Sequence, residues 1–255
     1  MSSVLESLLA TLPAGTVQEI RLGAFWTAVV VEVKGQRRCG LASTLRGFDD
    51  HHYGGGPAVG QAGQLLEQSA TDLARLVQAT SLMEASIGMA TINALLPLQP
   101  EWWVEVNAEE VIARHGAGKG VALVGHFPFI PRLREQVGQL WVLEQDPRGD
   151  DLPAEAAVDI LPQAEVIAIT GTSLVNHTFE TLMARRNPAA IVLLLGPSTP
   201  LSPILFDYGV HLLSGAVVED IDSVLRAVSQ GANFRQVHRQ GVRLVTMQSP
   251  DTRPL

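Results

Sequence analysis

The chain has 255 residues, of which 46% are hydrophobic and 17% are charged, so it can bury a sizeable core in one large domain or two modest ones. A formal net charge of −8 argues against an electrostatic surface for nucleic acid. The single cysteine, Cys39, excludes an internal disulfide and a cysteine-rich metal site. The sequence has neither an apolar run of the roughly 18 residues that a membrane span needs nor the features of a signal peptide. We therefore expect a cytoplasmic protein without a membrane partner.

The first part of the chain, residues 1–105, predicts an α+β domain. A short amphipathic helix is expected over residues 1–12. Three strands of an antiparallel meander follow, at residues 17–22, 26–33 and 38–42. Two helices are predicted next, over residues 65–79 and 81–96. The second helix has Ser81 and Glu84 at the spacing of a capping box.

The second part, residues 106–255, predicts a domain in which strands and helices alternate. Apolar runs that suit buried parallel strands lie at residues 121–124, 139–143, 165–169, 190–195 and 211–218. Helical patterns accompany them at residues 130–137, 151–161, 178–186 and 220–230. The expected fold class is therefore α/β: an N-terminal α+β domain, then a Rossmann-like domain with a doubly wound parallel sheet. The tail after Gln248 is expected to be disordered or to add a strand.

Three polar loops follow three of the predicted parallel strands. Their sequences are Gly125-His126-Phe127-Pro128, Thr170-Gly171-Thr172-Ser173 with Asn176 shortly after, and Gly196-Pro197-Ser198-Thr199-Pro200. Ligands of open α/β sheets bind where the strands emerge at their carboxyl ends. We therefore expect the loops to form one composite pocket.

Each loop suggests a role in that pocket. Gly125, His126 and Phe127 would form its floor, with His126 as a general acid or base and Phe127 able to stack on a planar ring. Hydroxyls and backbone N–H groups of the second loop suit polar or anionic groups, although ordinary helix capping is an alternative. Its predicted ligand-binding residues are Thr170, Gly171, Thr172 and Asn176. Prolines stiffen the third loop, whose predicted ligand-binding residues are Gly196, Pro197, Ser198 and Thr199.

Glu144 follows Gly125 by 19 residues, at the end of the second predicted strand. An acidic residue there binds ribose hydroxyls in many nucleotide folds. The full glycine fingerprint of a dinucleotide site is absent, so the pair fits an adenosine-type ligand better than NAD. An acid in a surface turn is the alternative interpretation.

Two further groups of residues carry candidate chemistry. Glu84 and Asn93, on the predicted helix 81–96, could reach into the pocket from the first domain, with Glu84 as a second candidate acid or base. Imidazole and carboxylate groups at Asp49, Asp50, His51 and His52 could bind a divalent metal. A solvated polar loop is the favoured interpretation of that group, because adjacent side chains on a strand point apart.

Several sequence segments resemble those of an uncharacterised family described as "putative heavy-metal chelation". The resemblance runs from about residue 4 to residue 245, and its strings lie at residues 85–95, 125–129, 152–162, 169–176 and 195–203. It implies a first part similar to the N-terminal domain of enolase and a Rossmann-like second part with a partial likeness to methyltransferases. It also implies a pocket between the two parts. The roles it suggests are condensation or hydrolysis of pterin-, flavin- or siderophore-like molecules, linked to heavy-metal handling.

Three hypotheses of function follow. The leading one is a small-molecule binding protein or enzyme that acts on a heteroaromatic, metal-chelating compound. The second is a methyltransferase that uses S-adenosylmethionine, with Glu144 on the ribose. The third is direct metal binding through the Asp49 to His52 group. The residues indicate no particular cofactor, and the Trp102-Trp103 pair suits a homo-oligomer interface as well as a satellite core.

Overall fold

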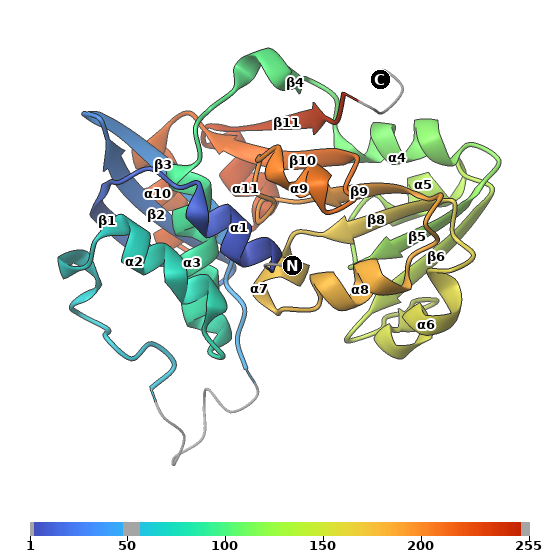
Figure 1. Cartoon of the computed structure of the whole chain (residues 1–255), viewed down its shortest axis with the longest axis horizontal. Helices are drawn as coiled ribbons and strands as arrows, with labels where there is room; N and C mark the ends of the chain where they lie inside the picture. Colours follow the sequence, from blue (N-terminus) through green and yellow to red (C-terminus); the bar gives the residue numbers. More distant parts are fainter. Residues whose placement is uncertain (1–2, 48–56, 251–255) are drawn as a thin grey trace.

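The chain folds around two β-sheets, a small antiparallel sheet of three strands and a larger, mostly parallel sheet of eight (Figure 1). The structure is a computed structural model that describes residues 3–47 and 57–250. This mixed α/β architecture confirms the predicted fold class. In the described ranges, none of the helices has the length and apolar character to cross a bilayer.

The small sheet is the predicted meander. Its strands are β1 (Thr16–Leu22), β2 (Trp26–Val33) and β3 (Gln36–Ser43), and each pairs antiparallel with the next. Helix α1 (Val4–Ala10) precedes them and starts at Ser3 with a capping box: the Ser3 hydroxyl accepts from the backbone N–H of Glu6, whose carboxylate accepts from Ser3. Consecutive residues of β2 and β3 are buried, so both faces of the small sheet must pack against other elements.

The predicted helix over residues 65–79 is wrong in one respect, because the structure breaks it into three short pieces. These are η1 (Leu65–Glu67), α2 (Ala70–Arg75) and η2 (Leu76–Gln78), where η marks a 3-10 helix. The break falls at Ser69, whose hydroxyl accepts from the backbone N–H of Asp72 at 3.1 Å and so starts α2 as an N-cap. Serine side chains favour such caps over helix interiors, which explains the interruption.

Helix α3 (Leu82–Leu95) covers one face of the small sheet and is buried almost all round. Glycines let it approach its neighbours closely. A Cβ atom on Gly40 of β3 would lie 2.1 Å from the carbonyl oxygen of Ala90, and a Cβ on Gly88 would lie 1.9 Å from the backbone nitrogen of Val77. The helix therefore packs against backbone on both sides, and this contact holds the N-terminal unit together.

The large sheet has the strand order β4-β11-β10-β9-β8-β5-β6-β7. Its strands are β4 (Trp103–Val104), β5 (Gly120–Val124), β6 (Gln139–Glu144), β7 (Leu152–Pro153), β8 (Val166–Thr170), β9 (Ile191–Leu195), β10 (Leu212–Val218) and β11 (Val242–Gln248). The six strands from β7 to β10 are parallel. Taken in chain order they follow the 3-2-1-4-5-6 arrangement of nucleotide-binding doubly wound sheets. The topology therefore reverses between β5 and β8, which are neighbours.

Short helices connect and cover these strands. They are η3 (Pro100–Trp102), α4 (Ala108–Gly116), α5 (Ile130–Arg134), η4 (Ala154–Ala156), α6 (Ala157–Ile160), α7 (Thr172–Val175), α8 (Phe179–Arg185), α9 (Ile204–Asp207), α10 (Ile221–Ser229) and α11 (Phe234–Arg239). Neither α11 nor β11 was predicted. Strand β11 runs antiparallel to β10, and β4 runs antiparallel to β11, so Trp103 joins the large sheet although it precedes the predicted domain division at residue 105.

The two parts of the chain share a core. Helix α10 and helix α11 pack on the face of the small sheet opposite α3, where Val30 and Leu41 contact Val224 and Val237. Cys39 lies in the same cluster, and burial raises the pKa of its thiol to about 12. The thiol is therefore held in its neutral, unreactive form and packs as a small apolar side chain.

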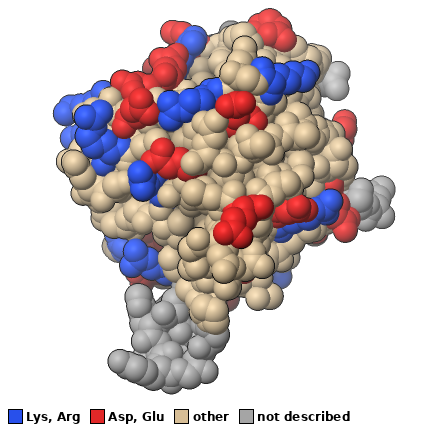
Figure 2. All heavy atoms as spheres, turned by 90° about the vertical axis from the view of Figure 1, so that its left-hand side faces the viewer, with Lys and Arg blue, Asp and Glu red and all other residues tan. Residues whose placement is uncertain are grey.

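The face of the molecule shown in Figure 2 carries acidic and basic side chains close to one another, separated by uncharged areas. Ion pairs of this kind on the small sheet join Arg21 to Glu19 and Arg37 to Asp222 of α10, the latter at 3.2 Å. Exposed pairs contribute little to stability, but they neutralise the arginines that take part in them.

Candidate functional site

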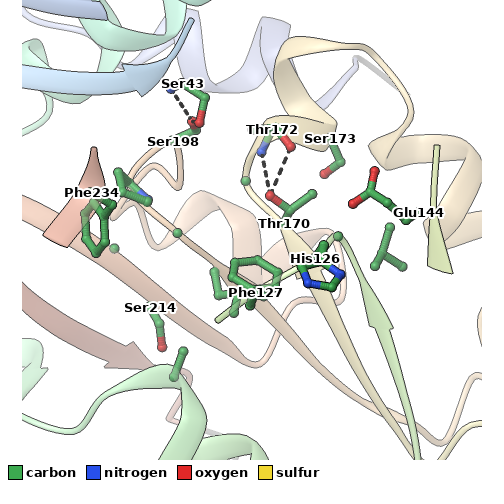
Figure 3. A pocket seen from close by; sticks show the side chains of 18 of the residues that line it. Ser43, His126, Phe127, Glu144, Thr170, Thr172, Ser173, Ser198, Ser214 and Phe234 are labelled. Atoms are coloured by element: carbon green, nitrogen blue, oxygen red, sulfur yellow. Dashed lines mark hydrogen bonds between the residues drawn. The ribbon is translucent and has the colours of Figure 1, made fainter. Parts of the chain in front are cut away.

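A cavity of about 1250 Å³ opens at the carboxyl ends of the parallel strands. The loops after β5, β8 and β9 line it, and so do Trp26, Ser43 and Leu45 from the N-terminal unit. It lies over the point between β5 and β8 where the sheet topology reverses, the place where doubly wound folds bind ligands. We call it the switch-point cavity (Figure 3).

A glycine directly follows each of the strands β5, β8 and β9, and its backbone N–H group adds one more hydrogen bond to the sheet. The backbone N–H groups of Gly125, Gly171 and Gly196 donate to carbonyl groups of the neighbouring strands, at 2.9, 2.7 and 2.9 Å. Gly125 and Gly196 have φ angles of 107° and 104°, which residues with a Cβ atom avoid. Glycine at these positions therefore lets the chain turn away at the edge of the sheet and leave space above it.

The structure places most of the predicted site residues on the wall of the switch-point cavity. They are Gly125, His126, Phe127, Glu144, Thr170, Gly171, Thr172, Asn176, Gly196, Pro197 and Ser198. Glu84, Asn93 and Thr199, which we expected to reach into the pocket, do not line it. Their contacts, described below, are with other parts of the protein.

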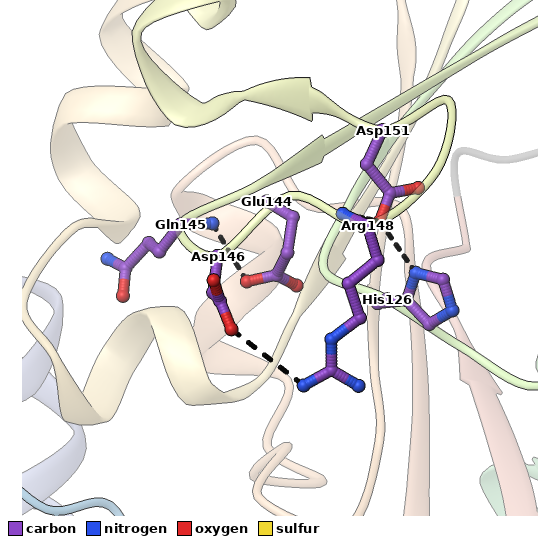
Figure 4. Close-up of polar contacts among 6 residues, drawn as sticks. All are labelled: His126, Glu144, Gln145, Asp146, Arg148 and Asp151. Carbon is purple, nitrogen blue, oxygen red and sulfur yellow. Dashed lines mark hydrogen bonds and ion pairs between the residues drawn. The ribbon is translucent and has the colours of Figure 1, made fainter.

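His126 is oriented by a carboxylate that the sequence analysis did not single out. Its Nδ1 atom lies 2.8 Å from Oδ2 of Asp151, whose side chain is only 3% exposed, whereas that of His126 is 41% exposed (Figure 4). The same Asp151 oxygen accepts from the backbone N–H of Arg148 at 3.2 Å. An ionised Asp151 accepts from Nδ1–H, which leaves Nε2 of His126 as the ring atom able to exchange a proton with a ligand.

Glu144 ends β6 beside this pair (Figure 4). Its Oε1 atom accepts from the backbone N–H of Gln145 at 2.8 Å, which holds the carboxylate at the cavity wall. Strand β6 neighbours β5 on the side away from β8, so Glu144 occupies the position at which doubly wound folds hold a ribose.

The hydroxyls of the second loop bond to one another. Oγ1 of Thr170 lies 3.0 Å from Oγ1 of Thr172, and Oδ1 of Asn176 accepts from the hydroxyl of Thr178 at 2.7 Å. The side chains at the helix starts do not act as caps. Gly171 and Thr178 occupy the N-cap positions of α7 and α8, and neither helix has a side-chain capping bond there. The loop is instead a pre-ordered polar surface on the cavity.

Two aromatic groups face the cavity. Phe127 stacks on Phe129, with ring centroids 5.2 Å apart and an angle of 16° between planes. Trp26 of β2 packs against Phe234 of α11, with ring centroids 5.4 Å apart, and Phe234 stacks on His238. The second group escaped the sequence analysis because it forms only when α11, an unpredicted helix, packs next to β2. An aromatic residue directly after Asn233, a good helix N-cap, was the available signal.

Ser198, which lines the cavity, and Asn93, which does not, both connect the two units. The Ser198 hydroxyl accepts from the backbone N–H of Ser43 at 2.9 Å, and Nδ2 of Asn93 donates to carbonyl oxygens of Leu41 and Pro197, at 2.8 and 3.3 Å. These bonds fix the third loop against β3 and α3. The Nδ2 group of Asn93 thus has two buried acceptors, whereas its Oδ1 atom is buried without a hydrogen bond to any described residue.

Thr199 and Glu84 also have structural contacts. Thr199 is buried behind Gly171, where a Cβ atom would lie 2.6 Å from its backbone nitrogen and its Oγ1. Glu84 accepts from the backbone N–H of Gly60 at 2.8 Å, so its carboxylate does not close the expected capping box with Ser81. Sequence alone could not separate these residues from the cavity wall, because each contact joins segments far apart in the chain.

Replacing Ser198 with alanine should lower the free energy of unfolding by about 1 kcal/mol, because the N–H group of Ser43 loses its acceptor. Ser173 provides a matched control: it is equally buried, 1% exposed, but its hydroxyl has no partner among the described residues. Ser173→Ala should not lower the free energy of unfolding, because it removes a buried hydroxyl that has no hydrogen bond to lose. Urea denaturation of both variants measures the difference, and equal losses would show that the bond to Ser43 adds no stability.

The metal hypothesis concerns residues that the structure does not describe. Asp49, Asp50, His51 and His52 lie outside the described ranges. Within residues 3–47 and 57–250, no group of three or more His, Cys, Asp or Glu side chains is arranged to hold a metal ion.

Similarity to known proteins covers almost the whole chain. Over 209 residues it is 25% identical to an uncharacterised protein of Methanocaldococcus jannaschii, a match that covers 78% of each chain. A crystal structure of a protein of unknown function from Desulfitobacterium hafniense superimposes with a TM-score of 0.81 and 26% identity, over 96% of this chain and 98% of that one. A protein of unknown function from Pyrococcus horikoshii gives the same TM-score and coverage at 19% identity, and so supports the fold alone.

Two family profiles with the same description match the two parts of the sequence in turn, one over residues 5–96 and the other over residues 107–247. The second alone spans more than half of the chain. The protein therefore belongs to the family described as "Putative heavy-metal chelation".

Proposed function

We propose that the switch-point cavity binds a planar, metal-chelating small molecule, such as a pterin-, flavin- or siderophore-like compound, and that His126 exchanges a proton with it. The observation that carries the proposal is the His126–Asp151 pair, held at 2.8 Å on the wall of a cavity that both units build. Family membership supplies the link to heavy-metal handling.

The size and lining of the cavity support a ligand of this kind. Small-molecule sites usually measure about 300–1,000 Å³, and the volume of about 1250 Å³ has room for a ring system with substituents. Phe127 and Phe234 offer aromatic surface to such a ring, since stacked aromatic pairs contribute beyond their buried area. Thr170 and Thr172 offer hydroxyls to its heteroatoms.

The His126–Asp151 pair supports acid–base chemistry on the ligand. A buried carboxylate that accepts from Nδ1 keeps the imidazole in one tautomer and one orientation. Nε2 then either removes a proton from the ligand or returns one, as condensation and hydrolysis both require. Asp151 acts through His126 and is a positioning residue.

Thermal unfolding in the presence of neopterin, riboflavin and 2,3-dihydroxybenzoate tests the proposal. At least one of these compounds should raise the melting temperature of the wild type, because a ligand that binds only the native state stabilises it. The same compound should have a much smaller effect on Phe127→Ala. If none of the compounds changes the melting temperature, or if a compound raises it equally in the wild type and in Phe127→Ala, the cavity is not the binding site. Native mass spectrometry of the purified protein provides an independent search for a retained compound.

The position of Glu144 favours a second candidate, a methyltransferase that uses S-adenosylmethionine. The carboxylate lies at the end of the second parallel strand, beside the topological switch point, where it could accept from ribose hydroxyls. Calorimetric titration with S-adenosylmethionine should then give heat in the wild type and at least about tenfold weaker binding in Glu144→Gln. Absence of heat in the wild type would remove this candidate.

A further inference from the structure

Three arginines line the switch-point cavity. Arg46, Arg185 and Arg235 line it, and none of them forms an ion pair with a residue in the described parts of the chain. They come from the segment after β3, the last turn of α8 and the first turn of α11. Cations therefore reach the cavity from both units of a protein whose net charge is −8.

The acidic residues of the cavity do not balance these arginines. Glu109 is already held by Arg132, through two bonds of 2.6 and 2.8 Å. Glu144 accepts from the backbone of Gln145 and is the other carboxylate on the wall. All three arginines are exposed. The charge that remains available to a ligand at this opening is therefore mainly positive.

Two buried hydrogen-bond donors belong to residues that line the cavity and have no partner in the described part of the chain. Nε1 of Trp26 and Oγ of Ser173 are buried without a hydrogen bond to any described residue. The indole N–H of tryptophan can only donate. Figure 3 shows Ser173 beside Thr172 and Glu144, at the edge of the cavity opposite Phe234. A buried donor without a partner is costly, so an acceptor on a ligand that reached these two groups would remove that cost.

We propose that the ligand carries at least two anionic acceptor groups, carboxylate or phosphate, on or beside its ring. This inference rests on the proposed function, because it specifies the chemical class of the ligand of that same cavity. One group would bind near Arg185 and Ser173, and the other near Arg235 and Trp26. Charge-assisted bonds from guanidinium groups are the strong ones, and arginine suits planar, two-oxygen anions.

A matched pair of fluorescent probes tests the inference. The probe 8-anilinonaphthalene-1-sulfonate is anionic, and N-phenyl-1-naphthylamine has the same rings without the sulfonate. The wild type should bind the anionic probe at least about tenfold more tightly. Because the probe has a single sulfonate, at least one of Arg185→Glu and Arg235→Glu should weaken its binding by about tenfold, and both should leave the neutral probe unchanged. For the arginine concerned, Arg185→Gln or Arg235→Gln should give a smaller loss in the same direction.

Arg75→Glu is the control for a change of overall charge. Arg75 lies on α2 beside Asp72, is exposed, and does not line the cavity, so its reversal should leave both probes unaffected. Circular dichroism of each variant checks that it has folded. Citrate and pyrophosphate then compete against the anionic probe in the wild type. Displacement by citrate identifies carboxylate as the preferred group and displacement by pyrophosphate identifies phosphate, and either supports the inference.

The outcomes separate this inference from the proposed function. If Phe127→Ala leaves the affinity for both probes unchanged, neither probe occupies the cavity, and the proposed function and the inference fail together. If Phe127→Ala weakens both probes but the arginine reversals do not discriminate between them, the cavity is a binding site and the anionic ligand is wrong. Failure of both citrate and pyrophosphate to compete would also overturn the inference.

Discussion

Gly171→Ala should lower the free energy of unfolding by about 1–3 kcal/mol, because the added Cβ atom would overlap the third loop. The Cβ would lie 2.6 Å from the backbone nitrogen and Oγ1 of Thr199. Gly171 has φ −59° and ψ −19°, a helical conformation that alanine adopts freely. In a chain of this size the loss corresponds to a fall in melting temperature of about 2–4 °C per kcal/mol.

The sign of this effect distinguishes packing from backbone entropy. If the second and third loops did not touch, Gly171→Ala would stabilise the protein by about 0.4–1 kcal/mol, because alanine restricts the unfolded chain. Gly60→Ala is the matched control, since the nearest atom to its new Cβ is Oε1 of Glu84 at 3.4 Å, an ordinary contact. Urea denaturation of both variants measures the two effects, and a stabilised Gly171→Ala would refute the close packing of the loops.

His126→Ala should weaken binding of the pterin, flavin or catechol compound that stabilises the wild type by at least about tenfold. The loss follows because Nε2 of His126 is the polar ring atom that the pair with Asp151 leaves free for a ligand. The free energy of unfolding should change by less than about 1 kcal/mol, since the imidazole is 41% exposed and is not part of a core cluster. Titration calorimetry and urea denaturation of the same variant measure the two quantities. A loss of stability with unchanged affinity would contradict a ligand-binding role.

Asp151→Asn separates positioning from direct contact. Nitrogen NMR of the wild type should show that the neutral imidazole of His126 is the Nδ1–H tautomer, because the Asp151 carboxylate accepts from Nδ1. In Asp151→Asn the amide can donate as well as accept, so the two tautomers should mix. An unchanged tautomer would show that Asp151 does not set the state of the ring.

Much of the fold could be predicted because its signals are local. A parallel strand that is covered on both faces must be apolar throughout, and runs such as residues 190–195 satisfy this without reference to any other segment. The meander was likewise evident from its alternating residues and turns. Strand β11 was missed although Val242–Gln248 is rich in apolar and β-branched residues, because it comes after a helix and runs antiparallel to β10, outside the expected parallel pattern.

The site was predictable only in part. Strand ends in a parallel sheet meet at one edge, so the three loops could be assigned to a common pocket before their contacts were known. Which side chain of a loop faces the pocket is a different question. Ser198 and Thr199 are adjacent, yet one bonds to Ser43 and the other packs behind Gly171. Both outcomes depend on where the N-terminal unit sits.

Most strands and helices up to α10, the polar loops at the strand ends and the residue types in those loops follow from the amino-acid sequence, because hydrophobic period and turn residues act over a few positions. The pairing of Asp151 with His126, the aromatic contact between Trp26 and Phe234, and the link that Asn93 makes between the two units depend on how distant segments pack. Each of these contacts joins segments that the chain separates widely, and the packing of α3, α10 and α11 on the small sheet brings both units together around the cavity.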